Sequence, residues 1–167
     1  MDTEKMQKAF DDEAISNVNM MLYSEKAKEE GFNAIGDKLN EIAHNNMAHA
    51  KIWLNELGKS STTEENLQNS IDSHKEEIEF YTDWQQEDDS PQLKAIIQVK
   101  EAQLEDLQES LNQMDTETMF ITPKSSEWYC TNCGFIAKGK RCPLYCPLCG
   151  CHQGYFKIYK RRYIDNN

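Results

Sequence analysis

The sequence predicts an all-α bundle of four helices followed by a small β/knuckle domain that a metal ion holds together. Residues 3–120 contain one proline and are rich in Glu, Lys, Gln, Asn, Met and Leu, which is a helical composition. All six cysteines follow residue 129, so the composition changes between Thr116 and Glu127. A length of 167 residues suits one ordinary domain and one small one. We therefore expect a helical domain at 1–120, a linker at 121–127 and a metal domain at 128–167.

Turn and capping residues divide the first domain into four helices. Gly31 separates the first helix from the second, and Gly58 ends the second. Thr62 and Glu65 form a candidate capping box before the third helix. Pro91 suits the first position of the fourth, where its missing N–H leaves no bond unmade. The expected helices are residues 3–29, 33–57, 64–87 and 91–118, and helices of this length form a bundle.

Each predicted helix carries an acidic residue or a histidine within its apolar stripe. In chain order these are Glu13, His49, His74 with Glu77, and Glu101. An unpaired buried carboxylate is strongly unfavourable, so four such positions at similar depth predict a metal site in the bundle core. Taken singly, each has a plainer explanation. His49 could bond a neighbour within the core, and Glu13 or Glu101 could reach water from the edge of its stripe.

Two Cys-x-x-Cys turns near the C-terminus predict a four-thiolate metal site. They are Cys130 with Cys133 and Cys146 with Cys149, and a glycine follows each turn. That glycine permits a positive φ, which turns backbone N–H groups toward the sulfurs. Two disulfides are the alternative, but nothing else in the chain suggests secretion. Iron and zinc both accept tetrahedral sulfur, so the motif does not choose between them.

Two further thiols, Cys142 and Cys151, flank the second turn. Neither begins a Cys-x-x-Cys-Gly unit, so we do not count them as ligands. They are either buried, unreactive thiols, which we favour, or reactive thiols that oxidise under peroxide stress.

Charge and hydropathy limit the partners and the location. The net charge of −11 argues against nucleic acid. From Lys124 onward, eight basic and two acidic residues give +6, so the rest of the chain carries −17. The basic segment from Lys124 onward either docks on the acidic helical domain or has a positive charge without functional meaning. The N-terminus lacks a signal peptide and no apolar run could span a membrane, so we expect a cytoplasmic protein with reduced thiols.

Motifs along nearly the whole chain resemble the rubrerythrin family. They are Lys8-Ala9-Phe10-x-x-Glu13, Lys28-Glu29-Glu30-Gly31-Phe32, His49-Ala50-Lys51 and the two cysteine turns. The resemblance implies a ferritin-like four-helix bundle followed by a rubredoxin-like domain. It also implies a di-iron carboxylate site in the bundle and an Fe(Cys)4 centre. Members reduce peroxide at the di-iron site with electrons that pass through the Fe(Cys)4 centre.

The family's bundle ligands are only partly present. Its pattern is matched at Glu13, His49, Glu77 and Glu101. His74 replaces a glutamate but can still bind a metal, whereas Asn46 replaces a glutamate and Leu104 replaces a histidine. Three carboxylates remain on the matched positions, where two divalent irons prefer about four. We therefore expect an asymmetric site that holds one metal well, with a weak or absent second one.

The connection between the second and third helices departs from the family geometry. Ferritin-like bundles join these helices by a long crossover, but residues 58–63 span at most roughly 20 Å. The helix they would have to run back along is roughly 37 Å long. The chain therefore forms either an up-down-up-down bundle or a homodimer in which two copies exchange helix pairs. We expect the helix-swapped homodimer.

Three functions follow from these features. The first is a rubrerythrin-like peroxide reductase with non-haem iron in the bundle, Glu13, His49, Glu77 and Glu101 at its catalytic site, and a reduced donor protein as partner. The second is an electron carrier or redox sensor with a working Fe(Cys)4 centre and a degenerate di-iron site. The third is a zinc-stapled protein that docks a partner through Lys160, Arg161 and Arg162. We favour the first.

Overall fold

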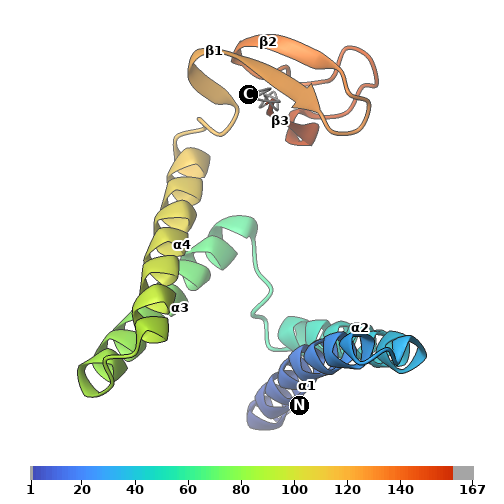
Figure 1. Cartoon of the computed structure of the whole chain (residues 1–167). Helices are drawn as coiled ribbons and strands as arrows, with labels where there is room; N and C mark the ends of the chain where they lie inside the picture. The colour runs from blue at the N-terminus through green and yellow to red at the C-terminus, as the bar shows by residue number, and fades with distance from the viewer. Residues whose placement is uncertain (1, 160–167) are drawn as a thin grey trace, which may run out of the picture. The chain divides into compact units, whose positions relative to one another are not determined.

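The computed structural model describes residues 2–159 and contains four helices followed by a small antiparallel sheet (Figure 1). The helices are α1 (Thr3–Glu29), α2 (Asn33–Glu56), α3 (Thr63–Glu87) and α4 (Pro91–Asp115). The strands are β1 (Ile121–Cys130), β2 (Ile136–Arg141) and β3 (Phe156–Ile158). The predicted fold class, four helices and then a small β domain that carries the cysteines, is confirmed. The described residues form two compact units, 2–66 and 67–159.

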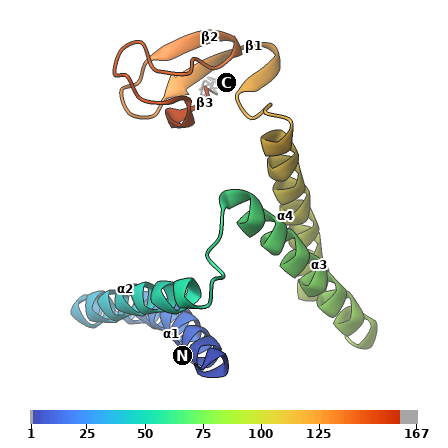
Figure 2. The ribbon, with the colours of Figure 1, turned by 180° about the vertical axis from the view of Figure 1, so that it is seen from behind.

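Helices α1 and α2 form an antiparallel hairpin, seen from behind in Figure 2. Gly31, with a φ of 86°, ends α1 in the left-handed conformation. Small residues line the contact between the helices. A Cβ on Gly36 would lie 2.6 Å from Cγ of Lys28, so an alanine there would push the helices apart.

Two buried polar side chains join the hairpin. The amide of Asn17, which is 6% exposed, donates to the carbonyl of Ala43 at 2.7 Å. The hydroxyl of Ser24 donates to the carbonyl of Gly36 at the same distance. Each bond satisfies a buried donor that would otherwise be unpaired. The hairpin is therefore held by polar bonds as well as by close packing.

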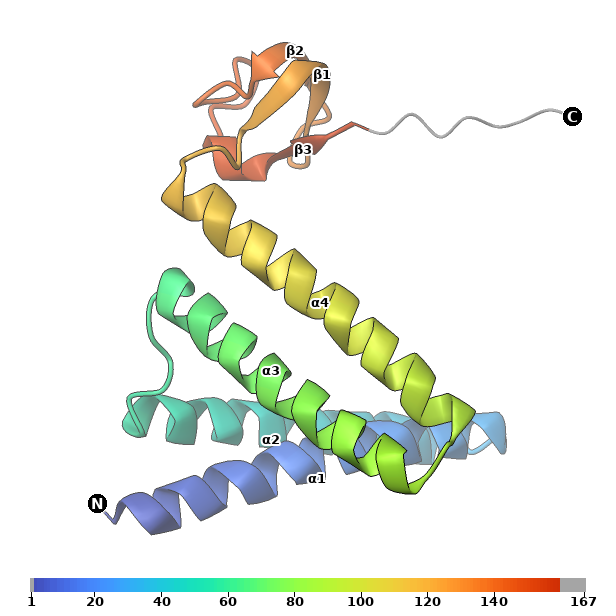
Figure 3. The same ribbon diagram turned by 90° about the vertical axis from the view of Figure 1, so that its left-hand side faces the viewer.

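Helix α3 begins at the capping box that the sequence predicts. The N–H of Glu65 donates to Oγ1 of Thr62 at 3.2 Å, and the N–H of Thr62 donates to Oε2 of Glu65 at 3.1 Å. The bond from the Thr62 N–H to the carboxylate lowers the pKa of Glu65, and hydrogen bonds from the side chains of Thr62 and Ser61 add to this effect. Pro91 is the first residue of α4, as predicted. Figure 3 shows the two helices from the side.

The ends of the predicted helices differ from the observed ones by up to three residues. The largest difference is at α4, which stops at Asp115 rather than at residue 118. The hydroxyl of Thr116 donates to the carbonyl of Asn112, and Glu117 has a φ of 53°. Glu117 therefore adopts the left-handed conformation at the end of α4 that a glycine usually adopts, because the sequence has no glycine there.

The β domain is a three-stranded antiparallel sheet in the order β2-β1-β3. Residues 121–127, predicted as a linker, form the first part of β1, which carries an irregularity between Ile121 and Ser126. The domain boundaries themselves stay a prediction. The buried core consists of Trp128, Cys130, Cys142, Cys146 and Phe156. Three of these five residues are cysteines, so the core is built around sulfur.

Among residues 2–159, no helix has the length and hydropathy that crossing a membrane requires.

Replacing Asn17 by alanine should lower the free energy of unfolding by about 1–3 kcal/mol, because the carbonyl of Ala43 loses its buried donor. Chemical denaturation followed by circular dichroism measures the change. The matched control is Asn45→Ala, which removes an exposed asparagine from α2 and should change the stability by less than about 0.5 kcal/mol. Equal losses in both variants would contradict a role for the buried bond.

Candidate metal centre

Four cysteine sulfurs converge in the β domain. The Sγ atoms of Cys130, Cys133, Cys146 and Cys149 all lie within 4.8 Å of one another. Sγ of Cys130 is 3.7 Å from that of Cys149, and Sγ of Cys133 is 3.5 Å from that of Cys146. A tetrahedron with metal–sulfur bonds of about 2.3 Å has edges of about 3.8 Å. The four residues therefore fit a tetrahedral metal ion, as the two predicted turns require.

The two cysteine turns have the same backbone design. The N–H of Gly134 donates to the carbonyl of Cys130, and that of Gly150 donates to the carbonyl of Cys146, both at 2.8 Å. The glycines have φ values of 80° and 75°. A side chain at either position would strain the turn, which explains why glycine ends both motifs. Backbone bonds thus shape both turns.

Each turn offers one buried sulfur and one that approaches the surface. Cys130 and Cys146 are buried, whereas Cys133 and Cys149 are half-buried. Leu148, which lies inside the second turn, is exposed. One side of the centre is therefore enclosed by the domain core, and the other approaches the surface.

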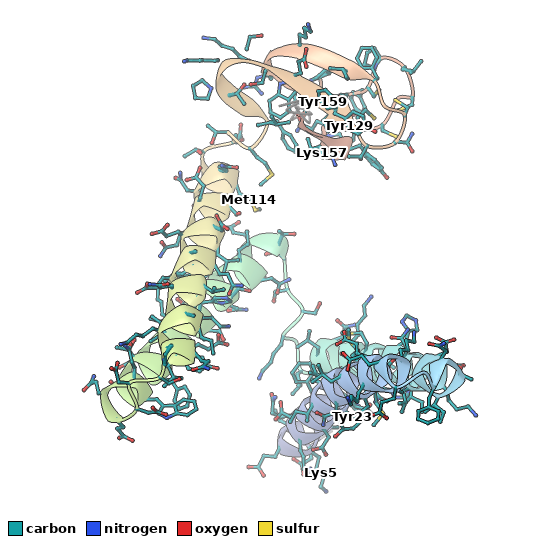
Figure 4. The ribbon with its side chains drawn as sticks, viewed as in Figure 1. Lys5, Tyr23, Met114, Tyr129, Lys157 and Tyr159 are labelled. Carbon is teal, nitrogen blue, oxygen red and sulfur yellow. The ribbon has the colours of Figure 1, made fainter. Side chains whose placement is uncertain are left out.

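An aromatic cluster flanks the first turn. The rings of Tyr129 and Tyr159 stack at 5.8 Å, and Nζ of Lys157 lies 5.7 Å from the centroid of Tyr129 (Figure 4). Tyr129 directly precedes the buried Cys130 and pairs with Lys157 across β1 and β3. The cluster fixes the end of β1 at the point where the first turn begins.

The two outer thiols have very different pKa values. The backbone N–H of Cys151 and the side chain of Asn132 stabilise the thiolate of Cys149 and lower its pKa to about 6. The N–H of Phe135 also lowers the pKa of Cys133, but burial and the neighbouring thiols outweigh it and raise that pKa to about 12. Without a metal the four sulfurs therefore cannot all be anionic near neutral pH, and metal binding must release protons.

The two spare thiols lie beside the centre and are not among the converging four. Cys142 is buried in the core, and burial raises its pKa to about 11. Burial and the Cys149 thiol also raise the pKa of the half-buried Cys151. Both remain protonated at neutral pH, which favours the interpretation of unreactive thiols.

In the first unit, two predicted bundle ligands contact each other. Nδ1 of His49 lies 3.4 Å from Oε1 of Glu13. Asn46, at the position where the family has a glutamate, donates instead to the hydroxyl of Ser16 at 2.8 Å. The α1–α2 hairpin thus retains one carboxylate and one imidazole side by side.

In the second unit, the predicted ligands have protein partners or face solvent. Glu77 forms an ion pair with Lys100, and Nδ1 of His74 bonds the carbonyl of Ser70 at 2.9 Å. Glu101 is exposed, and Leu104 offers no donor. Within residues 2–159, the four cysteines are the single group of three or more donors close enough to share a metal ion. The helical metal site stays a prediction.

Sequence reasoning missed Lys100. Leu93, Ile97 and Leu104 recur at three- and four-residue steps along α4, and Lys100 falls on the same stripe. A lysine on such a stripe favours an acidic partner on a neighbouring helix, and this pattern could have revealed the pair with Glu77.

In metal-free protein, iodoacetamide should modify Cys149 before Cys133, because Cys149 is the thiolate near neutral pH. The rate at Cys149 should be nearly constant at pH 7–8 and fall as the pH drops through about 6, where the thiolate becomes protonated. Mass spectrometry of peptides gives both rates, with the buried Cys142 as the internal control. A midpoint near pH 9 at Cys149 would contradict the assignment.

Comparisons with known proteins agree with this architecture. No protein-family model matches the sequence. The chain is 27% identical to a Methanocaldococcus jannaschii protein provisionally named a rubrerythrin, with 96% of this chain and 93% of the relative covered. It is 26% identical to rubrerythrin-1 of Clostridium acetobutylicum and 25% identical to rubrerythrin of Clostridium perfringens, each covering 96% of this chain and 95% of the relative.

Solved structures of nigerythrin also match. The mixed-valence state covers 94% of this chain and 86% of its own, at 17% identity and a TM-score of 0.34. The structural score is too low to carry an argument, so the relationship rests on the sequence matches and on the four converging cysteines. Along nearly its whole length, the chain is a distant relative of the rubrerythrin family.

Proposed function

We propose that this chain is a redox protein that transfers electrons one at a time through iron held by Cys130, Cys133, Cys146 and Cys149. The observation that carries the proposal is the convergence of the four sulfurs, with two of them half-buried. The distant rubrerythrin relatives favour iron over zinc, although zinc would fit the same four sulfurs. Thiolate-bound iron supplies a one-electron couple between its ferric and ferrous states.

The chain's own residues would adjust that couple. The N–H groups of Phe135 and Cys151 stabilise negative charge on Cys133 and Cys149. Such bonds favour the more negatively charged, reduced state of a thiolate centre and so raise its reduction potential. The half-buried sulfurs give an electron a short route to the surface, while buried Cys130 and Cys146 anchor the centre in the core.

Peroxide reduction at a second iron site is the other candidate function. Its catalytic ligands would be Glu13, His49, Glu77 and Glu101, with His74 as a further ligand, and a reduced donor protein would supply electrons through the cysteine centre. The contact between Glu13 and His49 and the rubrerythrin relatives support it. Against it stand Asn46 and Leu104 at two ligand positions and the pairing of Glu77 with Lys100. We therefore place electron transfer first.

Partner docking through the basic tail and a cytoplasmic location are two further parts of the functional hypothesis. Lys160, Arg161 and Arg162, the proposed docking tail, lie outside the described residues. A cytoplasmic location is part of the proposal and is supported by the free thiols of all six cysteines.

A homodimer is also part of the proposal. The helical hairpin α1–α2 exposes large apolar side chains, which a second copy could cover. They are Ile15, Val18, Met21, Leu22, Tyr23, Ile35, Ile42, Met47 and Ile52. The short connection after α2 supports an exchange of helix pairs between the copies.

Protein produced in iron-rich medium should contain about one iron per chain and show a red ferric–thiolate chromophore that a reductant bleaches. Cys149→Ser should abolish the chromophore, because it removes one of the four ligands. Cys142→Ala should retain it, because Cys142 is a neighbouring thiol outside the ligand set. Zinc as the sole metal, bound even in iron-rich growth, would contradict the redox function.

Peroxide turnover with a reduced donor separates the two candidate functions. Electron transfer alone predicts one iron and no turnover. Peroxide reduction predicts about two or three irons, turnover, and a loss of at least about tenfold in kcat for Glu101→Ala. Turnover that Glu101→Ala leaves unchanged would contradict the role assigned to this residue.

Sedimentation velocity at micromolar concentration should give a single dimeric species. Loss of the exposed apolar surface from water is the expected driving force, so the dimer should persist in high salt. A monodisperse monomer under these conditions would contradict the helix-swapped arrangement.

A further inference from the structure

The ammonium of Lys100 lies in an interior position of α4. Lys100 shares the stripe of Leu93 and Ile97, both of which are buried. The Lys100 side chain is only 26% exposed, an unusual value for a lysine. A partly buried lysine side chain is stabilised by an anion on a neighbouring helix.

Glu77 of α3 is that anion. Nζ of Lys100 donates to Oε2 of Glu77 in a close ion pair that joins the two helices. Glu77 is a position where the family resemblance implies a metal ligand. Its carboxylate therefore already has a cation, and that cation belongs to the protein.

The surroundings of Glu77 retain part of a metal site. His74 lies three residues earlier on α3, on the same face of the helix. The carbonyl of Ser70 can only accept, so Nδ1 of His74 carries the proton and Nε2 is left as the nitrogen that could bind a metal. Leu104 of α4, where the family pattern has histidine, offers nothing. Two donors thus remain on one face of α3, and the ammonium contacts one of them, Glu77.

We propose that Lys100 is a built-in cation that takes the place of a metal ion at Glu77. The ammonium of Lys100 donates to one carboxylate oxygen of Glu77, which then cannot bind a metal in the same position. Its positive charge would also repel a divalent ion at short range. Glu77 and Glu101 together carry two negative charges, of which Lys100 cancels one. The pair α3–α4 thereby holds its carboxylate without metal, which also explains how the chain tolerates a leucine at position 104, where the family pattern has histidine.

Manganese(II) is a suitable probe, because it prefers carboxylate and other oxygen ligands over thiolate and leaves thiolate-bound iron in place. Full-length protein with its cysteine centre loaded would be titrated with Mn²⁺, and free Mn²⁺ measured by electron paramagnetic resonance. The variant is Lys100→Met, which keeps the length of the stem and removes the charge. It should bind one Mn²⁺ per chain at least about tenfold more tightly than the wild type.

Three variants make the result specific. Lys94→Met removes the ammonium that pairs with Asp89 near the start of the same helix, where Lys94 is more exposed than Lys100, and should bind no more Mn²⁺ than the wild type. Lys100→Arg keeps the positive charge and should also leave binding unchanged. Adding Glu77→Gln to Lys100→Met should abolish the gain, because the carboxylate is lost.

The inference would be overturned if folded Lys100→Met bound Mn²⁺ no better than the wild type. It would also be overturned if Mn²⁺ raised the Tm of the wild type as much as that of Lys100→Met. The wild-type comparison stands even where Lys100→Met folds poorly, because strong Mn²⁺ binding with Lys100 in place contradicts the proposal by itself. Iron bound by the four cysteines is measured separately. The proposed electron transfer at that centre and the proposed role of Lys100 can therefore fail independently of each other.

Discussion

Four cysteine sulfurs within 4.8 Å of one another are the constraint on which the β domain depends. Four thiolates at this spacing repel one another, so they must be protonated or share a cation. The domain has little else to hold it, because three of its five buried core residues are cysteines. A domain this small rarely buries enough apolar surface to be stable alone. We therefore expect metal binding and folding of this domain to be coupled.

The helical part follows a different principle, since protein groups satisfy its polar interior. Asn17 and Ser24 bond carbonyls of α2, Asn46 bonds Ser16, and Glu77 bonds Lys100. Among the described residues, no buried side-chain polar atom lacks a partner. The asparagine at position 46 and the leucine at position 104 thus leave no buried polar atom unpaired among the described residues. The two parts of the chain differ in whether a metal is needed to complete the fold.

Local patterns predicted most of the fold, because their physics acts within a few residues. The capping box at Thr62 and Glu65 and the helix start at Pro91 both lie where the sequence places them. The cysteine turns belong to the same class, because the Gly134 bond to Cys130 closes within five residues. Features of this kind are set by backbone geometry and short-range hydrogen bonds.

Features that depend on distant partners were predicted poorly. Residues 121–127 contain Pro123 and two serines, which favour a linker, but pairing of Ile121 with Arg141 makes them part of a strand. The partner of Asn46 is thirty residues away in sequence, and that of Lys100 is twenty-three. A motif inherited from a family identifies such positions but does not reveal which side chain has replaced the missing ligand.

If the centre holds iron, as we propose, the matching backbone bonds of the two cysteine turns have a consequence for the speed of electron exchange. Each turn is closed by its own glycine N–H, and the N–H groups of Cys130 and Cys146 are fixed by the carbonyls of Phe135 and Cys151. The sulfurs are thus positioned by the chain and not by the oxidation state of whatever they bind. A centre whose ligands need not move when an electron arrives has a low reorganisation energy. In the proposed electron transfer, the rate would then be limited mainly by how close a partner can approach the half-buried Cys133 and Cys149.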